Sequence, residues 1–190
     1  MSGPTKKERT HERIVRSAAR AIRRDGYHGV SVADIMKEAG LTHGGFYAHF
    51  PSRDALLVEA LACAASDSVK SLEDAASRGP GGQGLKGVVD AYLSDAHAAS
   101  PEQGCTLAAL GSETPRQAPE VRAAAAQQVQ RMIELLERQL PEDEPRRREE
   151  AMAMASTLVG ALLISRVIGD TDLARSFRKA AKRSLLTKAR

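Results

Sequence analysis

Cys105 and His97 are the residues whose types and spacing could do covalent chemistry. A thiolate beside a histidine is the nucleophile and base of thiol enzymes, and Cys105 follows Gly104 at an expected helix start, where backbone amides can stabilise a thiolate. No third residue that would orient the histidine and no oxyanion motif accompanies this pair. The five histidines show neither HExxH nor another metal-ligand spacing. The sequence therefore predicts no enzyme, no metal site and no cofactor.

The two cysteines also bear on the compartment. Cys63 and Cys105 cannot form a disulfide framework, and no apolar leader follows the charged N-terminus, so we expect a reduced, cytoplasmic protein. The longest apolar stretch, Ala151 to Ile164, is interrupted by polar residues and is too short to span a membrane, which predicts no membrane partner. Cys63 is expected in the core, and a small buried apolar residue is one interpretation of Cys105.

Charge is divided unevenly along the chain and points to a polyanion. Residues 1–53 hold 10 Lys and Arg against 5 Asp and Glu, residues 54–174 hold 11 against 19, and residues 175–190 hold 7 against none. Basic ends around an acidic middle favour nucleic acid as the partner of one end. The role of the basic C-terminal segment stays open between covering neighbouring helices and keeping the terminus soluble.

Residues 26–50 carry the pattern that fits such a partner. Ser31 and Asp34 form a capping box at a helix start, and Gly40 ends that helix in a conformation that glycine tolerates best. Thr42 is expected to cap a second short helix, which Phe46 and Phe50 anchor at i and i+4. Helix, glycine turn and helix over about 20 residues predicts a helix-turn-helix, whose second helix can enter the major groove of DNA. Two packed helices of any bundle are the competing interpretation.

The preceding helix, which begins near Thr5, separates into two faces. Its apolar residues share one side, and the opposite side collects six arginines: Arg9, Arg13, Arg16, Arg20, Arg23 and Arg24. This row either lies along the phosphate backbone or is a solvated face.

The rest of the chain reads as further helices separated by prolines. Periodic apolar residues predict helices over 52–78, 85–99, 119–140, 146–168 and 172–186, with a short one after Gly104, and Val129 is expected to face inward. No strand alternation or hairpin signal occurs, so the prediction is all-α with about nine helices. The apolar residues of the helix over 146–168 cover more than one of its faces. This pattern predicts that one face packs against the core and another contacts a second subunit.

The stretch GLTHGGFYAHFPSRDALL, together with GYHGVSVADIMKEA before it, resembles the signature of the TetR/AcrR family of bacterial transcriptional regulators. The resemblance covers about residues 9–68. It implies a three-helix DNA-binding domain over 1–53 and a helical ligand-binding and dimerisation domain over 54–190. The implied function is a homodimeric repressor that leaves its operator DNA when a small-molecule effector or a reactive electrophile acts on it.

The resemblance also implies roles for individual residues. Tyr47 matches a phosphate-contacting tyrosine, and Arg53 stands where the family usually has a phosphate-contacting lysine. His43 and Gly44 occupy the positions expected to meet bases, while His49 either packs or contacts phosphate. Ser31 and Thr42, as caps, direct hydroxyl and amide groups at phosphates.

No lysine or arginine lies between Leu41 and Phe50, so we expect little direct readout of guanine and a large share of specificity from DNA shape. Cys105 gains a second interpretation, as a sensor of electrophiles or oxidants, because some family members sense them through a similar Gly-Cys. Two competing functions remain: a thiol enzyme using Cys105 and His97, and a ligand-binding dimer that has lost DNA recognition.

Overall fold

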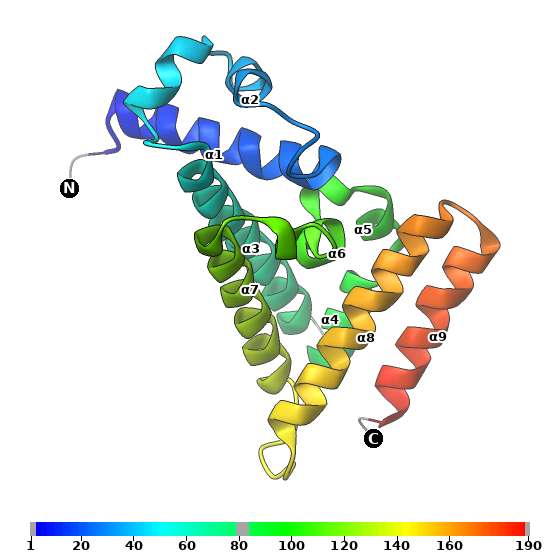
Figure 1. The fold of residues 1–190 in the computed structure, drawn as a ribbon. Coiled ribbons are helices and arrows are strands. Elements are labelled where there is room, and N and C mark those ends of the chain that lie inside the picture. The colour runs from blue at the N-terminus through cyan, green and yellow to red at the C-terminus, as the bar shows by residue number, and fades with distance from the viewer. Residues whose placement is uncertain (1–2, 79–83, 189–190) are drawn as a thin grey trace.

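The computed structural model describes residues 3–78 and 84–188, which fold entirely into helices and the turns that join them (Figure 1). In this part of the chain there are nine α-helices and no strand, so the all-α prediction is confirmed. The first half comprises α1 (Lys6–Asp25), α2 (Val32–Glu38), the 3₁₀ helix η1 (His43–Ala48), α3 (Arg53–Ser77) and α4 (Gly84–Tyr92). The second comprises α5 (Asp95–Ala99), η2 (Pro101–Gln103), α6 (Thr106–Leu110), η3 (Thr114–Arg116), α7 (Pro119–Glu137), α8 (Arg147–Ile168) and α9 (Asp172–Lys188).

One end of the molecule is formed by α1, α2 and η1, which we call the head (Figure 1). Its apolar residues pack with the first half of α3, from Leu56 to Ala64, and with Leu110, Val121 and Ala125. This first core therefore continues out of the head into the neighbouring helices. The long helix α3 is rooted in the head at one end and runs away from it at the other.

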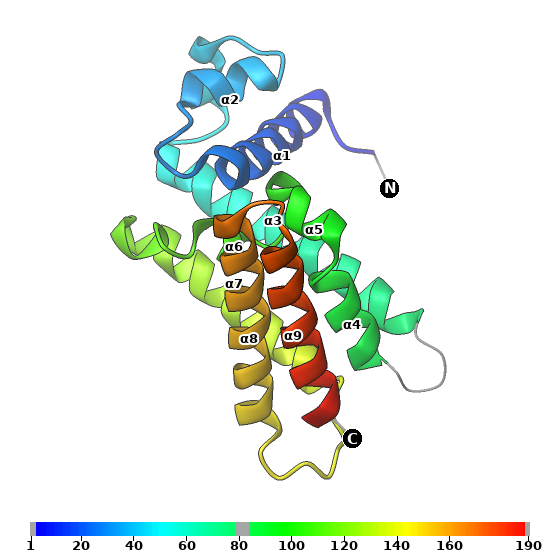
Figure 2. The ribbon, with the colours of Figure 1, turned by 90° about the vertical axis from the view of Figure 1, so that its right-hand side faces the viewer.

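A second core fills the body of the molecule, away from the head. It joins apolar residues of α4, the second half of α7, α8 and α9, with Val88, Leu136 and Leu158 fully buried. The helices α8 and α9 lie side by side at one surface (Figure 2).

Two expectations about the body were wrong in detail. The helix predicted over 85–99 is broken into α4 and α5, because the hydroxyl of Ser94 accepts a hydrogen bond from the His97 amide at 3.1 Å and so starts a new helix. Val129 is 39% exposed rather than inward, since α7 buries the neighbouring positions Gln128 and Met132 instead.

The helix α8 is longer than the apolar stretch found in the sequence. It has 22 residues, and an 18-residue stretch within it has a mean hydropathy of 1.8, which would suffice by length and composition to cross a membrane. Core helices of soluble proteins pass the same test, and α8 contributes Ala151, Leu158 and Leu162 to the second core while packing along α7 and α9.

Candidate functional site

The turn between α2 and η1 forms as the sequence predicts. The hydroxyl of Ser31 accepts a hydrogen bond from the Asp34 amide at 3.1 Å, and the Asp34 carboxylate accepts one from the Ser31 amide at 3.0 Å, which completes the capping box. The Ser31 hydroxyl also donates to the Asp34 carboxylate, and this bond together with the one from the Ser31 amide lowers the pKa of Asp34. At the other end of α2, Gly40 has φ +68°, and its amide and that of Leu41 bond to the carbonyls of Lys37 and Met36.

The second element of the motif is a 3₁₀ helix and not the expected α-helix. The adjacent Gly44 and Gly45 are poor helix formers, and the amide of Gly45 bonds to the Thr42 carbonyl at 3.1 Å, three residues back. Thr42 stands at the N-cap position, but its side chain makes no capping hydrogen bond, so that part of the prediction was wrong. Phe46 and Phe50 are buried and stacked, with ring centroids 5.6 Å apart, and anchor η1 in the first core.

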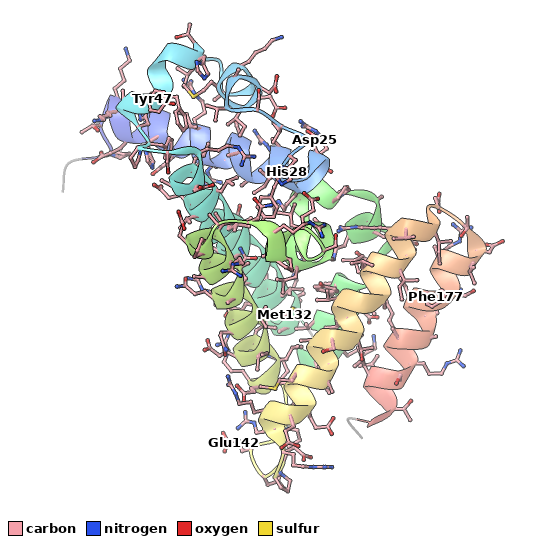
Figure 3. All side chains as sticks on the ribbon, in the orientation of Figure 1. Asp25, His28, Tyr47, Met132, Glu142 and Phe177 are labelled. Carbon is pink, nitrogen blue, oxygen red and sulfur yellow. The ribbon has the colours of Figure 1, made fainter. Side chains whose placement is uncertain are left out.

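The outer surface of η1 is open and carries no acidic group. Thr42, His43 and Gly44 are exposed, and the Tyr47 side chain is 72% exposed at the outer end of the head (Figure 3). A Cβ atom added to Gly44 would meet no atom within 4 Å, so the fold itself does not require glycine there. The absent side chain leaves room for another molecule to approach the backbone.

Two other predicted contact residues are engaged inside the protein. His49 is half-buried against His11 of α1, with ring centroids 5.9 Å apart, and its Nδ1 has no hydrogen-bond partner among the described residues. Burial and the nearby His11 lower the pKa of His49. Arg53 is also half-buried, and its guanidinium donates a hydrogen bond to the carbonyl of Tyr27, which fastens the start of α3 to the loop after α1.

The arginine row of α1 is shorter than predicted. Arg9, Arg13, Arg16 and Arg20 are exposed, whereas Arg24 pairs with Asp25 and Glu38 at 2.7 and 2.6 Å. Arg23 is 6% exposed, so its placement on the outer face was wrong. Its Nε donates to the Ala19 carbonyl at 2.8 Å and its Nη1 to the Gly104 carbonyl at 2.9 Å, which connects the head to the segment before α6.

A cavity of about 610 Å³ lies in the body between α3, α4, α7 and the segment around Cys105. Apolar side chains from three of these elements line it: Val69, Leu72, Leu107, Met132 and Leu135. Its polar lining includes Ser68, Tyr92, His97, Thr106 and Gln128. Gln128 is buried and donates to the Leu61 carbonyl at 2.7 Å while accepting a hydrogen bond from the hydroxyl of Thr106.

Cys105 lines this cavity and is 8% exposed, beside His97. Nδ1 of His97 lies 2.6 Å from the Tyr92 carbonyl, which can only accept, and Nε2 lies 3.0 Å from the Cys105 amide, which can only donate. These partners fix the neutral tautomer with the proton on Nδ1, and burial lowers the pKa of His97. Both ring nitrogens are therefore engaged, and neither can take a proton from the thiol.

Cys63 does not occupy the interior position that the sequence suggests. It is half-buried at the edge of the first core, and burial raises the pKa of its thiol. Cys105 is the more buried of the two cysteines.

Residues 14–60 match a family described as "Bacterial regulatory proteins, tetR family", and residues 82–180 match "Transcriptional regulator LmrA/YxaF-like, C-terminal domain". The chain is 31% identical over 182 residues to a Mycobacterium tuberculosis protein named as an uncharacterized HTH-type transcriptional regulator, a match covering 90% of this chain and 88% of the relative. The chain belongs to the TetR family of transcriptional regulators.

Solved structures with the same fold include TetR-family regulators. A regulator from Cytophaga hutchinsonii superposes with a TM-score of 0.83 at 20% identity, covering 97% of this chain and 94% of that one. The reduced form of Escherichia coli NemR superposes with a TM-score of 0.81 at 17% identity, covering 94% and 96%. As a TetR-family member, the chain is a DNA-binding transcriptional regulator and not an enzyme.

Sequence reasoning missed several residues of this TetR-family protein that the fold brings together around the cavity. Tyr92, Ser68 and Gln128 line it, and Arg166 lies near Tyr92 and Cys105. They come from four different helices, so no local spacing indicates their proximity. The burial of Arg23, by contrast, has a signal in the sequence. Arg23 lies at the edge of the arginine row beside the small residue Ala19, where a neighbouring element can approach.

Proposed function

We propose that this chain is a cytoplasmic, homodimeric repressor whose two heads bind operator DNA and whose cavity admits a small-molecule effector that releases it. In this proposal residues 1–53, which include the head, form the DNA-binding domain, and residues 54–190 form the ligand-binding and dimerisation domain. The observation that carries the proposal is the open, acid-free surface of η1, with Tyr47 exposed at its end.

In the DNA complex, we assign the phosphate contacts to Tyr47, Arg53, Ser31 and Thr42. His43 and Gly44 meet base edges, with His49 supporting η1 or reaching a phosphate. Tyr47 and Gly44 are accessible enough for these roles. Arg53 donates to the carbonyl of Tyr27, so it reaches a phosphate either with its remaining N–H groups or by giving up this hydrogen bond. A surface with two ring side chains, two glycines and no lysine or arginine favours readout of DNA shape over direct base contacts.

The dimer is supported by an exposed apolar surface on α8 and α9. Of the seven large apolar side chains that are exposed in the described part of the chain, five lie on these helices: Met152, Ile164, Val167, Leu173 and Phe177. Figure 3 shows Phe177 on the outer side of α9. An exposed patch of this kind marks an interface, and Gly160, where an added Cβ would meet nothing within 4 Å, lets a partner helix approach closely.

The effector acts through the cavity, either by occupying it or by reacting with Cys105. An electrophile is the second candidate because Cys105 lines the cavity and is the more buried thiol, so a reagent has to enter the cavity to reach it. Replacing Cys105 with alanine separates the two: a bound effector still releases DNA from the variant, whereas an electrophile no longer does.

A titration against the DNA upstream of the protein's own gene tests the proposal. Fluorescence anisotropy should show binding that weakens steeply with salt and exceeds binding to random DNA of equal length. Equal affinity for both would refute a specific regulator and favour a ligand-binding dimer without DNA recognition. Light scattering should give twice the protomer mass, and a monomer mass would refute the dimer.

A further inference from the structure

The charge of the cavity lining is one-sided. Among the described residues that line it there is no aspartate or glutamate, and the one residue carrying a full charge is Arg78, in the exposed turn that ends α3. A cationic molecule placed in this cavity would lose its hydration without meeting a counter-charge, which is costly. An anion would meet no like charge.

Two hydroxyl groups in the cavity wall form no hydrogen bond of good geometry with the described residues. They are the hydroxyl of Tyr92, from α4, which is 1% exposed and has only the weakly bonding Cys105 thiol beside it, and the hydroxyl of Ser68, from α3. Buried polar groups are normally hydrogen-bonded, so an unpaired hydroxyl on a residue that lines a cavity indicates a missing partner. Burial raises the pKa of Tyr92 well above its usual range, so this hydroxyl keeps its proton and can donate it in a hydrogen bond.

A buried guanidinium adds positive potential near Tyr92. Arg166, from α8, donates to the carbonyls of His97 at 2.8 Å and Ala98 at 3.4 Å, while its Nη1 is buried without a partner. Arg166 forms no ion pair with another described residue, although the carboxylate of Glu102 lies close enough to act on its charge. The charge of Arg166 is therefore balanced by the protein only at longer range.

The rest of the lining suits a carbon skeleton. Val69, Leu72 and Met132 are among its apolar residues, and about 610 Å³ is within the range of sites for drug-sized ligands. We propose that the effector is an organic anion, with an apolar body against these residues and a carboxylate or similarly acidic oxygen group that accepts hydrogen bonds from Tyr92 and Ser68. This inference rests on the proposed effector-controlled function and names the chemical class of the effector.

Three probes of one shape test the inference: 2-naphthoate, 2-naphthamide and 2-naphthylmethylammonium, titrated calorimetrically into the full-length protein at pH 7.5. The naphthoate should bind at least about tenfold more tightly than the ammonium probe, with the amide between them, because a hydrogen bond to a charged group is the stronger kind. Equal affinity for the carboxylate and ammonium probes would overturn the inference. So would the absence of naphthoate binding at millimolar concentration.

Two variants locate the acidic group. Tyr92→Phe should weaken naphthoate binding about tenfold or more and leave ammonium binding unchanged. It should lower the stability of the free protein little, because the hydroxyl loses only its weak interaction with the Cys105 thiol. Ser68→Ala should act in the same direction. The matched control is Tyr27→Phe, which removes a buried hydroxyl bonded to Thr114 outside the cavity and should leave naphthoate affinity unchanged. Unchanged naphthoate affinity in both Tyr92→Phe and Ser68→Ala would overturn the assigned position.

A DNA titration on the same protein samples separates this inference from the proposed function. If the protein binds its upstream DNA but does not discriminate among the probes, the effector class is wrong and the regulator stands. If the protein discriminates among the probes but has no preference for its upstream DNA, the regulator is wrong and the anion site stands.

Discussion

Replacing Arg23 with methionine tests how the head is fastened to the body. The guanidinium is buried, donates to the carbonyls of Ala19 and Gly104, and forms no ion pair with another described residue. Methionine keeps an unbranched, apolar stem of similar reach and removes the charge and all the donors. The Gly104 carbonyl then loses its donor from α1.

Three contributions determine the change in the free energy of unfolding. The two hydrogen bonds of a charged donor are worth roughly 3–6 kcal/mol together. Relief from burying an unneutralised cation offsets several kcal/mol, so these two contributions nearly cancel. The buried Gly104 carbonyl that is left without a partner costs about 1–3 kcal/mol. We therefore expect Arg23→Met to lower the unfolding free energy by about 1–3 kcal/mol, or the melting temperature by roughly 3–10 °C.

The measurement is urea denaturation followed by circular dichroism at one protomer concentration, since dimer stability depends on concentration. Arg20→Met is the matched control, because Arg20 is exposed on the same helix, and it should change the unfolding free energy by less than about 0.5 kcal/mol. If Arg23→Met is as stable as Arg20→Met, or more stable than the wild type, relief of charge burial outweighs the lost hydrogen bonds and the reasoning is refuted.

Four further outcomes follow from the structure. Tyr47→Phe should leave stability unchanged and weaken DNA binding at least about tenfold per half-site, because one hydrogen bond to a charged phosphate is lost. Unchanged DNA affinity in anisotropy titrations would remove Tyr47 from the contact residues. Gly44→Ala should leave the stability of the fold unchanged or raise it slightly, since nothing lies within 4 Å of the new Cβ, but it should weaken DNA binding. Full DNA affinity in this variant would show that the DNA does not approach the Gly44 backbone closely. Val167→Asp, at a side chain that is 79% exposed in the single chain, should shift the light-scattering mass toward the monomer, and a stable dimer would place the interface elsewhere. The pKa of His97 is lowered by burial below the 6.5 of an unfolded chain, so the unfolded state binds a proton first and stability falls as the pH drops below about 6.5. His97→Gln should flatten this dependence of the unfolding free energy between pH 7.5 and 5.5. Parallel stability curves for variant and wild type would contradict the assignment of this dependence to His97.

The sequence predicted most reliably what depends on local chemistry. The capping box of Ser31, the left-handed Gly40 and the buried pair Phe46 and Phe50 all follow from spacing within one or two turns of helix, and all are present. The exposure of Tyr47 follows from the same spacing, because Phe46 and Phe50 place the buried face of η1 and leave Tyr47 outside that face.

What the sequence could not predict depends on neighbours far along the chain. A helical wheel assigns Arg23 to the polar side, but the Gly104 carbonyl, 81 residues away, supplies the partner that makes its burial possible. Val129 is exposed because α8 and α3 meet α7 on other faces. The unpaired hydroxyls of Tyr92 and Ser68 are invisible to any pattern, because being unpaired is a property of the whole fold.

The position of Gln128 has a consequence for how the molecule opens. On α7 this buried amide separates Ala125 of the first core from Met132 of the second. It donates to the carbonyl of Leu61, in the first core, and accepts from Thr106, the neighbour of Cys105 in the second. Two apolar clusters that meet along a polar seam are weakly coupled, so under native conditions each should open in a sub-global reaction of its own, below the free energy of unfolding the whole chain. In native-state hydrogen exchange, amides of α3 near Leu56 should exchange together with the head, and those near Leu72 together with the body. A single helix would then report two separate opening reactions.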